Sequence, residues 1–395
     1  MEYLNIPENE LLKLGAFHTA KEISQQPVVW QQIFDNICSR KAELGEFLNH
    51  AFAHSKRIIL TGAGTSAYIG MSLSNSFQRQ TGIITQAIAS TDIVSNPENH
   101  LISGIPTLII SFARSGNSPE SVAVMELADG ILDTCFHLIV VCNEDGKLAA
   151  HKSIHRQYIF ALPKEANDES LAMTSSYSGM LLAGLLMARI NDIGTLKGCV
   201  DTIIRYTKKC LADFSPILQK IAQQDFKRAV FLGSGSFFGT ATEAQLKLQE
   251  LTDGRIICRN ETFLGFRHGP KAVMDATTLV FYFMSANELA CKYERDLVLA
   301  VRKGIHPLVE IGVTENRVQG TDLNNMFVFS ENEKITEEEF LTVCYIVPSQ
   351  ILGFYKSLQM GLRPDRPSVN DSITRVVEGV EIYTYKVSSP DKAFV

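Results

Sequence analysis

Short apolar runs alternate with longer amphipathic stretches along most of the chain. The runs are rich in β-branched and aromatic residues, as in TLIISF at 107–112 and TLVFYF at 278–283. Between such runs lie helical patterns, for example PESVAVMELADGIL and TATEAQLKLQEL. Continuous apolar strands separated by helices are typical of a parallel sheet covered on both faces. The pattern therefore predicts an α/β fold built from three-layer α/β/α sandwiches.

The pattern also repeats. ILTGAGTS at 59–66 matches VFLGSGSF at 230–237, and TLIISF matches TLVFYF, in both cases 171 residues later. STD at 90–92 and LIVVCN at 138–143 have counterparts within one residue of that offset, in ETF and LVEIGVT. This predicts a duplicated domain. We expect a helical lead-in over 1–45, domains over 46–205 and 206–358, and an irregular tail over 359–395 that lies over the active site.

Composition narrows the setting. The 395 residues are 45% hydrophobic and 20% charged with a net charge of -6, which indicates a soluble globular protein and argues against a nucleic-acid partner. The N-terminus lacks a signal-peptide pattern, and the apolar stretch MLLAGLLMA is too short to span a bilayer, so we expect no membrane partner and a cytoplasmic location. The eight cysteines form no C-x-x-C pair and are expected to be reduced.

The stretch IISFARSGNSPES at 109–121 runs from an apolar strand into a loop of small donors and then into a helix start. Main-chain N–H groups, a helix dipole and the hydroxyls of Ser115 and Ser118 together suit an anion such as phosphate. A second hydroxyl-bearing loop, GAGTS, adds Thr65 and Ser66. The second copy has FMSANEL in place of ARSGNSP, so we expect one phosphate pocket per chain.

Two other interpretations of these loops remain open at this point. Ser115 or Ser118 could simply cap the following helix. GAGTSA also fits the G-x-G-x-x-A pattern of a dinucleotide site, with Asp92 at a plausible distance, although the fingerprint is weak alone and does not use a hydroxyl-rich third loop.

The second copy carries candidate acid–base groups. Glu243, Lys247 and Glu250 are spaced i, i+4, i+7 and share one helical face, where a solvated salt-bridge stripe is the common alternative. His268 follows in the glycine-rich turn FLGFRHGP, a setting that suits an exposed acid–base group as well as a surface histidine. His50/His54 and His151/His155 have the spacing of helical metal ligands but no third ligand in sequence, so we expect neither a metal nor a cofactor.

Taken together, these motifs resemble the sugar isomerase (SIS) family in its double-domain form. The resemblance rests on TGAGTSAYIG, SFARSGNSPES, NEDGKLA, MTSS, EAQLKLQEL, FRHGP and GLRPDRP, and on KEISQQP near the N-terminus. It covers essentially the whole chain and extends to the isomerase half of glucosamine-6-phosphate synthase. It is closer to the AgaS-type group of galactosamine-6-phosphate deaminase/isomerases, also described as tagatose-6-phosphate ketose/aldose isomerases. It implies two tandem SIS domains with mostly parallel, flavodoxin-like sheets.

The resemblance also implies roles for single residues. By similarity, Thr65, Ser66, Ser115 and Ser118, with Asn117, would hold a sugar 6-phosphate, and Thr174 and Ser175 would line the sugar. Glu250 matches the base that moves a proton between C1 and C2, with Glu243 and Lys247 as polar partners. His268 matches a ring-opening histidine that reaches the site from a neighbouring subunit, which implies a homodimer.

Some positions depart from the family pattern. Ala113 and Arg114 replace the serine and glutamine of the synthase, so Arg114 is a further candidate phosphate ligand. The synthase's imine-forming lysine has no counterpart at the matching position in the tail. Arg375 is the nearest basic residue there, and a protonated arginine cannot form an imine.

The sequence also lacks a glutaminase part. This favours release of ammonia over its installation, and the resemblance then implies conversion of galactosamine 6-phosphate to tagatose 6-phosphate. A plain isomerase acting on a hexose 6-phosphate, and a sugar-phosphate sensor, are the alternatives.

Overall fold

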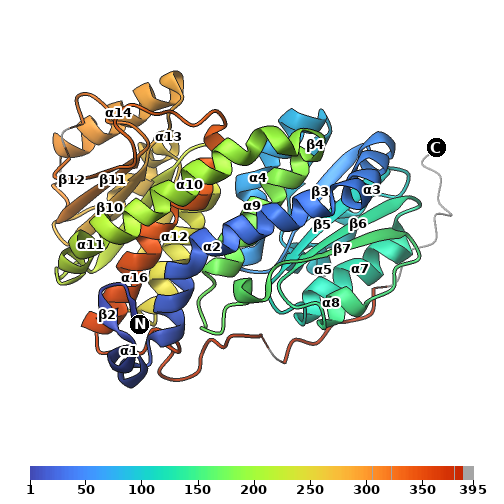
Figure 1. Cartoon of the computed structure of the whole chain (residues 1–395), viewed down its shortest axis with the longest axis horizontal. Helices are drawn as coiled ribbons and strands as arrows, with labels where there is room; N and C mark the ends of the chain where they lie inside the picture. The colour runs from blue at the N-terminus through green and yellow to red at the C-terminus, as the bar shows by residue number, and fades with distance from the viewer. Residues whose placement is uncertain (305, 322, 378, 386–395) are drawn as a thin grey trace.

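Two five-stranded sheets, one in each half of the chain, form the framework of the molecule (Figure 1). The computed structural model describes residues 1–304, 306–321, 323–377 and 379–385. The first sheet contains β3 (Arg57–Thr61), β4 (Ile84–Ala87), β5 (Thr107–Ala113), β6 (Cys135–Val141) and β7 (Arg156–Ala161). The second contains β8 (Arg228–Gly233), β9 (Ile257–Glu261), β10 (Thr278–Phe283), β11 (Val309–Thr314) and β12 (Asn325–Val328).

Both sheets have the same topology. The strand orders are β4-β3-β5-β6-β7 and β9-β8-β10-β11-β12, and every strand pair within them is parallel. Each order is the flavodoxin-like 2-1-3-4-5 arrangement. The register matches too: Ile59 pairs with Ile109 in the first sheet, and Val230 pairs with Val280 in the second. These findings confirm the predicted fold class and the predicted duplication.

Helices cover both faces of each sheet, as the continuous apolar strands predict. In the first sheet Ile59 and Ile109 pack with Val124 on one face, while Ile58 and Leu60 belong to the large central core on the other. The helices are α1 (Glu8–Leu14), α2 (Phe17–Ser39), α3 (Lys41–His54), α4 (Thr65–Thr81), α5 (Ser90–Ser95), α6 (Pro97–His100), α7 (Pro119–Ile131), α8 (Lys147–Ala150), α9 (Ser175–Ala188), α10 (Lys197–Lys209), α11 (Ser215–Ala222), α12 (Phe237–Leu251), α13 (Phe263–Phe266), α14 (Glu288–Arg302), α15 (Leu341–Tyr345) and α16 (Val347–Gln359). A small ribbon, β1 (Glu2–Tyr3) with β2 (Ile6–Pro7), precedes them.

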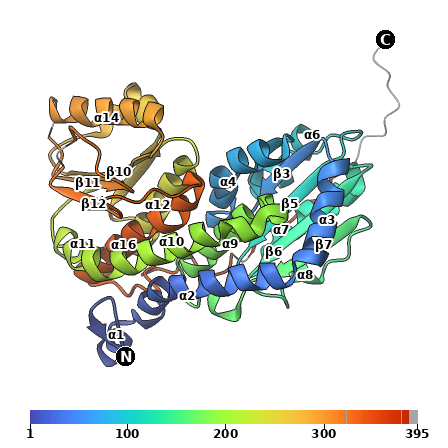
Figure 2. The ribbon, with the colours of Figure 1, turned by 45° about the horizontal axis from the view of Figure 1, so that its top comes forward.

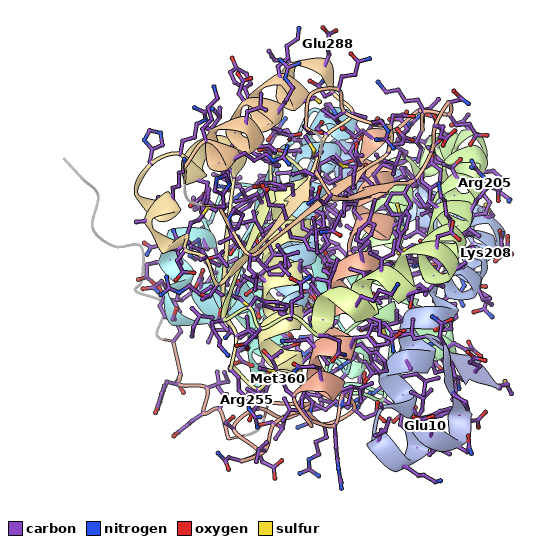
Figure 3. The ribbon with its side chains drawn as sticks, turned by 90° about the vertical axis from the view of Figure 1, so that its left-hand side faces the viewer. Glu10, Arg205, Lys208, Arg255, Glu288 and Met360 are labelled. Atoms are coloured by element: carbon purple, nitrogen blue, oxygen red, sulfur yellow. The ribbon has the colours of Figure 1, made fainter. Side chains whose placement is uncertain are left out.

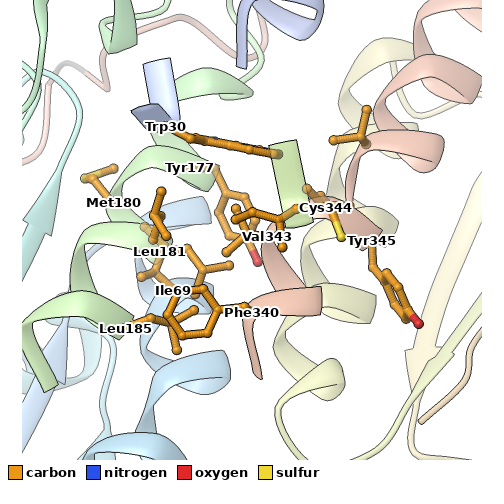
Figure 4. Close-up of a cluster of buried hydrophobic side chains, with 14 of the residues drawn as sticks. Trp30, Ile69, Tyr177, Met180, Leu181, Leu185, Phe340, Val343, Cys344 and Tyr345 are labelled. Carbon is orange, nitrogen blue, oxygen red and sulfur yellow. The ribbon is translucent and has the colours of Figure 1, made fainter. Parts of the chain in front are cut away.

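The two halves share one core. Figure 4 shows Trp30 of α2 and Tyr177 of α9 in one buried cluster with Phe340, which precedes α15, and Tyr345, the last residue of α15. Trp30 is fully buried, and its indole Nε1 donates to Ser178 Oγ at 3.0 Å. In Figure 2, α2 runs beneath both halves. The sheets are therefore held at a fixed relation to each other.

The predicted domain limits fall close to this shared region. The limit at residue 45 lies within α3, and the limit at 205 lies within α10, which continues through a π-helical turn, Cys210–Phe214, into α11. The domain limits thus remain a prediction. Of the helices that the structure describes, none is both long and apolar enough by itself to cross a membrane. One pair bent by 113°, Ser175–Ala188 with Ile190–Ala222, passes on length and composition alone.

A close helix crossing joins the two halves beside the shared core. At Gly239 of α12, an added Cβ would lie 2.6 Å from Ser72 N and 2.8 Å from Tyr68 O of α4. Backbone atoms cannot move aside as a flexible side chain can. Only glycine therefore lets α4 and α12 approach this closely.

We expect Gly239→Ala to lower the unfolding free energy by about 1–3 kcal/mol, because the added methyl forces the two helices apart. Gly198→Ala is the matched control. It lies in α10 with no heavy atom within 4 Å of an added Cβ, and there alanine should stabilise the helix by about 0.5–1 kcal/mol. Urea denaturation of both variants measures the effect. Equal stabilisation by both would show that the crossing has room for a methyl group.

Candidate active site

Two loops of the first domain meet at the carboxyl edge of its sheet. One joins β3 to α4 and the other joins β5 to α7, and β3 pairs directly with β5. In open parallel sheets, ligands bind at this edge next to the point where strand order reverses. A cavity of about 110 Å³ opens between the loops and is lined by, among others, Ala63, Ser66, Ser115, Gly116 and Ser118. The structure therefore brings four of the predicted phosphate ligands, Ser66, Arg114, Ser115 and Ser118, to one cavity.

The following segment, NEDGKLA, braces the serine loop from behind. Asn143 Nδ2 donates to Ser115 O at 3.1 Å, and Lys147 N donates to Asn117 Oδ1 at 3.1 Å. Gly116 adopts a φ of +65°, and at Gly146 an added Cβ would lie 2.5 Å from Ser115 O. The Asn117 side chain thus supports the loop and is not among the residues that line the cavity.

Ser118 serves as the N-cap of α7. Its Oγ accepts from Ser121 N at 3.4 Å and donates to Glu120 Oε2 at 2.8 Å. The capping interpretation therefore holds for this residue, and the same hydroxyl also lines the cavity. Ser115 Oγ accepts from Asn117 N at 3.2 Å, which leaves its proton available to a ligand.

A second, larger cavity continues from the first. It measures about 500 Å³ and shares Ala63, Arg114, Met173, Arg375 and Val377 with the smaller one. Thr65 and Glu250 line it as well, together with residues 371–374 of the tail. The serine loop of the first domain and a carboxylate of the second therefore face one continuous cleft.

A buried lysine ties the two domains together at this cleft. Lys247 Nζ lies 2.5 Å from Glu250 Oε2 and 3.3 Å from Glu243 Oε1, and it donates to Thr65 Oγ1 at 3.2 Å. The side chains of Lys247 and Glu243 are 0% exposed, and that of Glu250 is 20% exposed. The three charges are therefore not a solvated stripe. Glu250 alone of the three reaches the cleft.

Burial shifts the pKa of the two enclosed members of this cluster. Burial raises the pKa of Glu243 to about 8; Lys247 opposes the shift and Glu250 adds to it. Burial alone would lower the pKa of Lys247, but Glu243 and Glu250 outweigh it, so that pKa lies above its usual value. The lysine is thus a permanent cation, while Glu243 holds a proton near neutral pH.

Arg114 fastens the tail and the 167–171 segment to the serine loop. Its Nη1 donates to the carbonyls of Ser170 at 3.1 Å and Leu171 at 2.9 Å, and its Nη2 donates to Arg375 O at 2.5 Å. Arg375 in turn donates from Nε to Asp168 O at 2.8 Å and from Nη2 to Asn167 Oδ1 at 3.1 Å. Arg114 therefore borders both cavities while its guanidinium is engaged by main-chain carbonyls.

Three other predicted residues lie elsewhere. Thr174 and Ser175 are fully buried at the start of α9; Thr174 Oγ1 donates to Asp168, Ser175 Oγ donates to Glu22 O, and neither residue lines the cleft. His268 is exposed in the turn after α13 and lines neither cavity of the described chain. The structure of one subunit does not bring it to Glu250.

Sequence reasoning missed two carboxylates that organise the site. Asp168 accepts from the main-chain N–H groups of Thr174, Ser175 and Ser176, and so caps α9. Glu22 Oε1 accepts from the N–H groups of Glu169 at 2.5 Å and Ser170 at 3.3 Å. Burial, and next the nearby Asp168, raise the pKa of Glu22 to about 9. Neither has a signal in the sequence: Asp168 lies six residues before Thr174, the N-cap residue of α9, and Glu22 lies 147 residues from Glu169.

Among the described residues, no group of three or more His, Cys, Asp or Glu side chains is arranged to hold a metal ion. His50 and His54 stack with ring centroids 4.2 Å apart, and His151 pairs with Asp129 at 3.4 Å. All eight cysteines are free.

Comparison with known proteins defines the class. Residues 51–189 match the SIS domain family, and the identical topology of the second half makes this a double SIS-domain protein. The D-galactosamine-6-phosphate deaminase AgaS of Shewanella sp. (strain ANA-3) is 39% identical over 97% of this chain and 96% of its own length.

Solved structures agree with the sequence match. A candidate tagatose-6-phosphate ketose/aldose isomerase from Clostridium novyi superimposes with a TM-score of 0.94 at 36% identity, over 98% of this chain and 100% of that one. The tagatose-6-phosphate ketose/aldose isomerase of Escherichia coli gives 0.84 at 32% identity, over 93% and 97%. The chain belongs to the AgaS family of double SIS-domain proteins.

The raised pKa of Glu243 predicts a pH dependence of stability. Between pH 4.5 and about 8 the folded state keeps a proton on Glu243 that the unfolded state has lost, so this group's contribution falls as pH rises. We expect the wild type to lose stability relative to Glu243→Gln by up to about 1.4 kcal/mol per pH unit in this window. Urea denaturation from pH 5 to pH 8 measures the difference. A difference that stays flat, like that of the exposed control Glu126→Gln, would contradict the assignment.

Proposed function

We propose that this protein is an amino-sugar-phosphate deaminase/isomerase that converts galactosamine 6-phosphate to tagatose 6-phosphate and ammonia. One observation carries the proposal: a serine-lined cavity adjoins a larger cleft that Glu250 borders. An open-chain hexose phosphate has an anion at one end and its reacting carbons at the other, and the cleft matches this order. The names of the relatives favour the same reaction.

The phosphate would bind first, between Ser66, Ser115 and Ser118. The N-termini of α4 and α7 present main-chain N–H groups and positive dipole ends there. Thr65 continues the same loop and bonds Lys247, so the anchored sugar lies next to the charged cluster. Binding energy from a distant phosphate can be used to position the carbons that react.

Glu250 would then act as the base. It takes the proton from C2 of the open-chain aldehyde, and the resulting enolamine takes a proton at C1. This gives an imine at C2, which water hydrolyses to the ketone and ammonia. Lys247, 2.5 Å from Glu250, holds the carboxylate in place, and Glu243 holds Lys247 from the protein interior. No cofactor enters this sequence of steps.

A second subunit would complete the site. Ring opening is assigned by resemblance to His268, which in one subunit is exposed and away from the cleft. Two apolar side chains precede it in the same part of the chain: Ile257, the first residue of β9, and Leu264 of α13 are 63% and 48% exposed. A homodimer that covers this apolar surface would bring His268 to the neighbouring cleft. A phosphate-ester substrate is kept inside the cell, so we place the reaction in the cytoplasm.

The structural relatives carry the name of a ketose/aldose isomerase, which makes plain isomerisation of a hexose 6-phosphate the second candidate. It uses the same phosphate site and the same base, and it differs by the final hydrolysis. A non-catalytic sensor, the third candidate, would leave the Glu250 carboxylate in the cleft without a role.

Ammonia release separates the candidates. We expect ammonia from galactosamine 6-phosphate in a coupled assay, with tagatose 6-phosphate as the second product. Glucosamine 6-phosphate and tagatose 6-phosphate are tested in parallel, because the cleft residues do not define the configuration at C4. Ammonia from neither amino sugar, together with turnover of tagatose 6-phosphate, would favour the isomerase.

Replacement of the base tests the mechanism. Glu250→Gln should lower kcat by about 10²- to 10⁴-fold, because the amide cannot take the C2 proton, while KM changes little. Exchange of the C2 hydrogen with solvent deuterium, followed by NMR, should be lost in parallel. Glu126→Gln, on the exposed face of α7, should behave as the wild type. Full activity of the Glu250 variant would move the base to another residue.

A further inference from the structure

The second domain has its own loop at the place where the first domain has its serine loop. It joins β10 to α14 through Met284, Ser285, Ala286 and Asn287. Asn287 caps α14, its Oδ1 accepting from Leu289 N and Ala290 N at 3.1 Å each. Figure 3 labels Glu288, the first residue of this helix. The loop therefore keeps the architecture of an anion site, although its sequence lacks SGNS.

A cavity lies in front of this loop, as in the first domain. It measures about 270 Å³ and is bordered by Ser234–Phe237, which joins β8 to α12, and by Ser285, Asn287 and Ala290. The first cavity is bordered by the corresponding pair of loops after β3 and β5. The two halves thus place equivalent cavities at equivalent sheet edges.

The donors of this second loop are directed at a carboxylate of the chain itself. Glu338 Oε1 accepts from Ser285 Oγ at 2.5 Å, from Ala286 N at 2.5 Å and from Asn287 N at 3.2 Å. One hydroxyl and two successive main-chain N–H groups before a helix are the donors that a phosphate oxygen would use. Charge-assisted bonds of this kind are among the stronger hydrogen bonds in proteins.

A second carboxylate, that of Glu294, also accepts a hydrogen bond from this loop. Glu294 is 1% exposed, and its Oε2 accepts from Ser285 N at 2.7 Å. A free phosphate in the loop would lie beside both Glu338 and Glu294. The negative charges of the carboxylates and of the phosphate would repel each other. The loop is therefore closed to an external dianion while Glu338 is in place.

We propose that the second SIS domain retains an oxyanion site and that Glu338 occupies it as a permanent internal ligand. The site would take a small tetrahedral oxyanion, such as inorganic phosphate, once this carboxylate is removed. Each chain thereby keeps one phosphate site for substrate, and the duplicate site serves to fix the segment that carries Glu338.

The neighbours of Glu338 explain what this fixation achieves. Glu337 pairs with Arg189, just after α9, and Glu339 pairs with Arg79 of α4; both arginines belong to the first half of the chain. Phe340, next along, enters the shared core shown in Figure 4. Of these three successive glutamates, Glu338 binds the loop of the second domain, and Glu337 and Glu339 each pair with an arginine of the first half.

The test is the number of phosphate sites in the full-length protein. Isothermal titration with inorganic phosphate at pH 6 compares the wild type with Glu338→Ala; at this pH Glu294, whose pKa burial raises to about 7, is largely protonated. We expect Glu338→Ala to bind one phosphate more per chain than the wild type. Without phosphate its Tm should fall by roughly 5 °C, and phosphate should restore most of the loss.

Glu337→Ala is the matched control, because it removes the adjacent carboxylate and its ion pair but leaves the anion loop filled. It should lose stability without gaining a phosphate site or recovering with phosphate. An equal phosphate count in Glu338→Ala and wild type would overturn the proposal, as would equal recovery of both variants. A crystal of Glu338→Ala with phosphate away from Ser285 would also overturn it. The difference in count does not depend on the proposed reaction, whereas a wild type that binds no phosphate would count against that reaction alone.

Discussion

The arrangement of the cleft depends on a single buried cation. Lys247 lies on α12 of the second domain and bonds Thr65, the first residue of α4 in the first domain. Its side chain is 0% exposed and lies 2.5 Å from the Glu250 carboxylate, so its charge is compensated without water. A buried ion pair stabilises little by itself, but removal of one partner leaves an uncompensated charge and is costly. The cluster therefore specifies how the two domains meet more than it adds to stability.

This specification matters because the serine loop and Glu250, the proposed base, come from different halves of a duplicated chain. A substrate that spans both needs them at a fixed separation, since small errors of position are expensive in catalysis. The close crossing of α4 and α12 at Gly239, the shared core around Trp30 and the Lys247 cluster all act on the same relation between the halves. Duplication alone would give two equivalent domains. These contacts place them so that the first contributes the serine loop and the second contributes Glu250 to one cleft.

The sequence predicts the fold well because the fold depends on periodic local patterns. Apolar strands, helix starts and the 171-residue repeat predict both parallel sheets and the two loops at the carboxyl edge of the first sheet, while the flavodoxin-like strand order is implied by the family resemblance. Of the residues predicted for the site, Ser66, Ser115, Ser118, Thr65 and Glu250 border the cleft because each follows a strand or lies on one helical face.

The remainder depends on long-range contacts that no local pattern encodes. Thr174 and Ser175 turn inward because Asp168 and Glu22 accept their donors, and Glu22 comes from a helix far earlier in the chain. Arg114 donates to the carbonyls of residues 170–171 and of Arg375, so its basic side chain holds these segments together at the edge of the proposed phosphate site. The predicted tail covers the cleft with residues 371–375 in the described part, and residues 378 and 386–395 lie outside it.

The two copies show how a repeated fold acquires one function. Each sheet edge offers two loops, a helix start and a cavity, so the physics of the fold supplies an anion site twice. In the first copy, serine hydroxyls and the brace from Asn143 and Lys147 keep the loop open to a ligand. In the second, Glu338 satisfies the donors from within, and α12 contributes Glu250 to the first copy's cleft. Because buried donors must be paired, a duplicate loop that is closed to external ligands needs an internal acceptor, and an acidic residue on a neighbouring segment is the simplest one available.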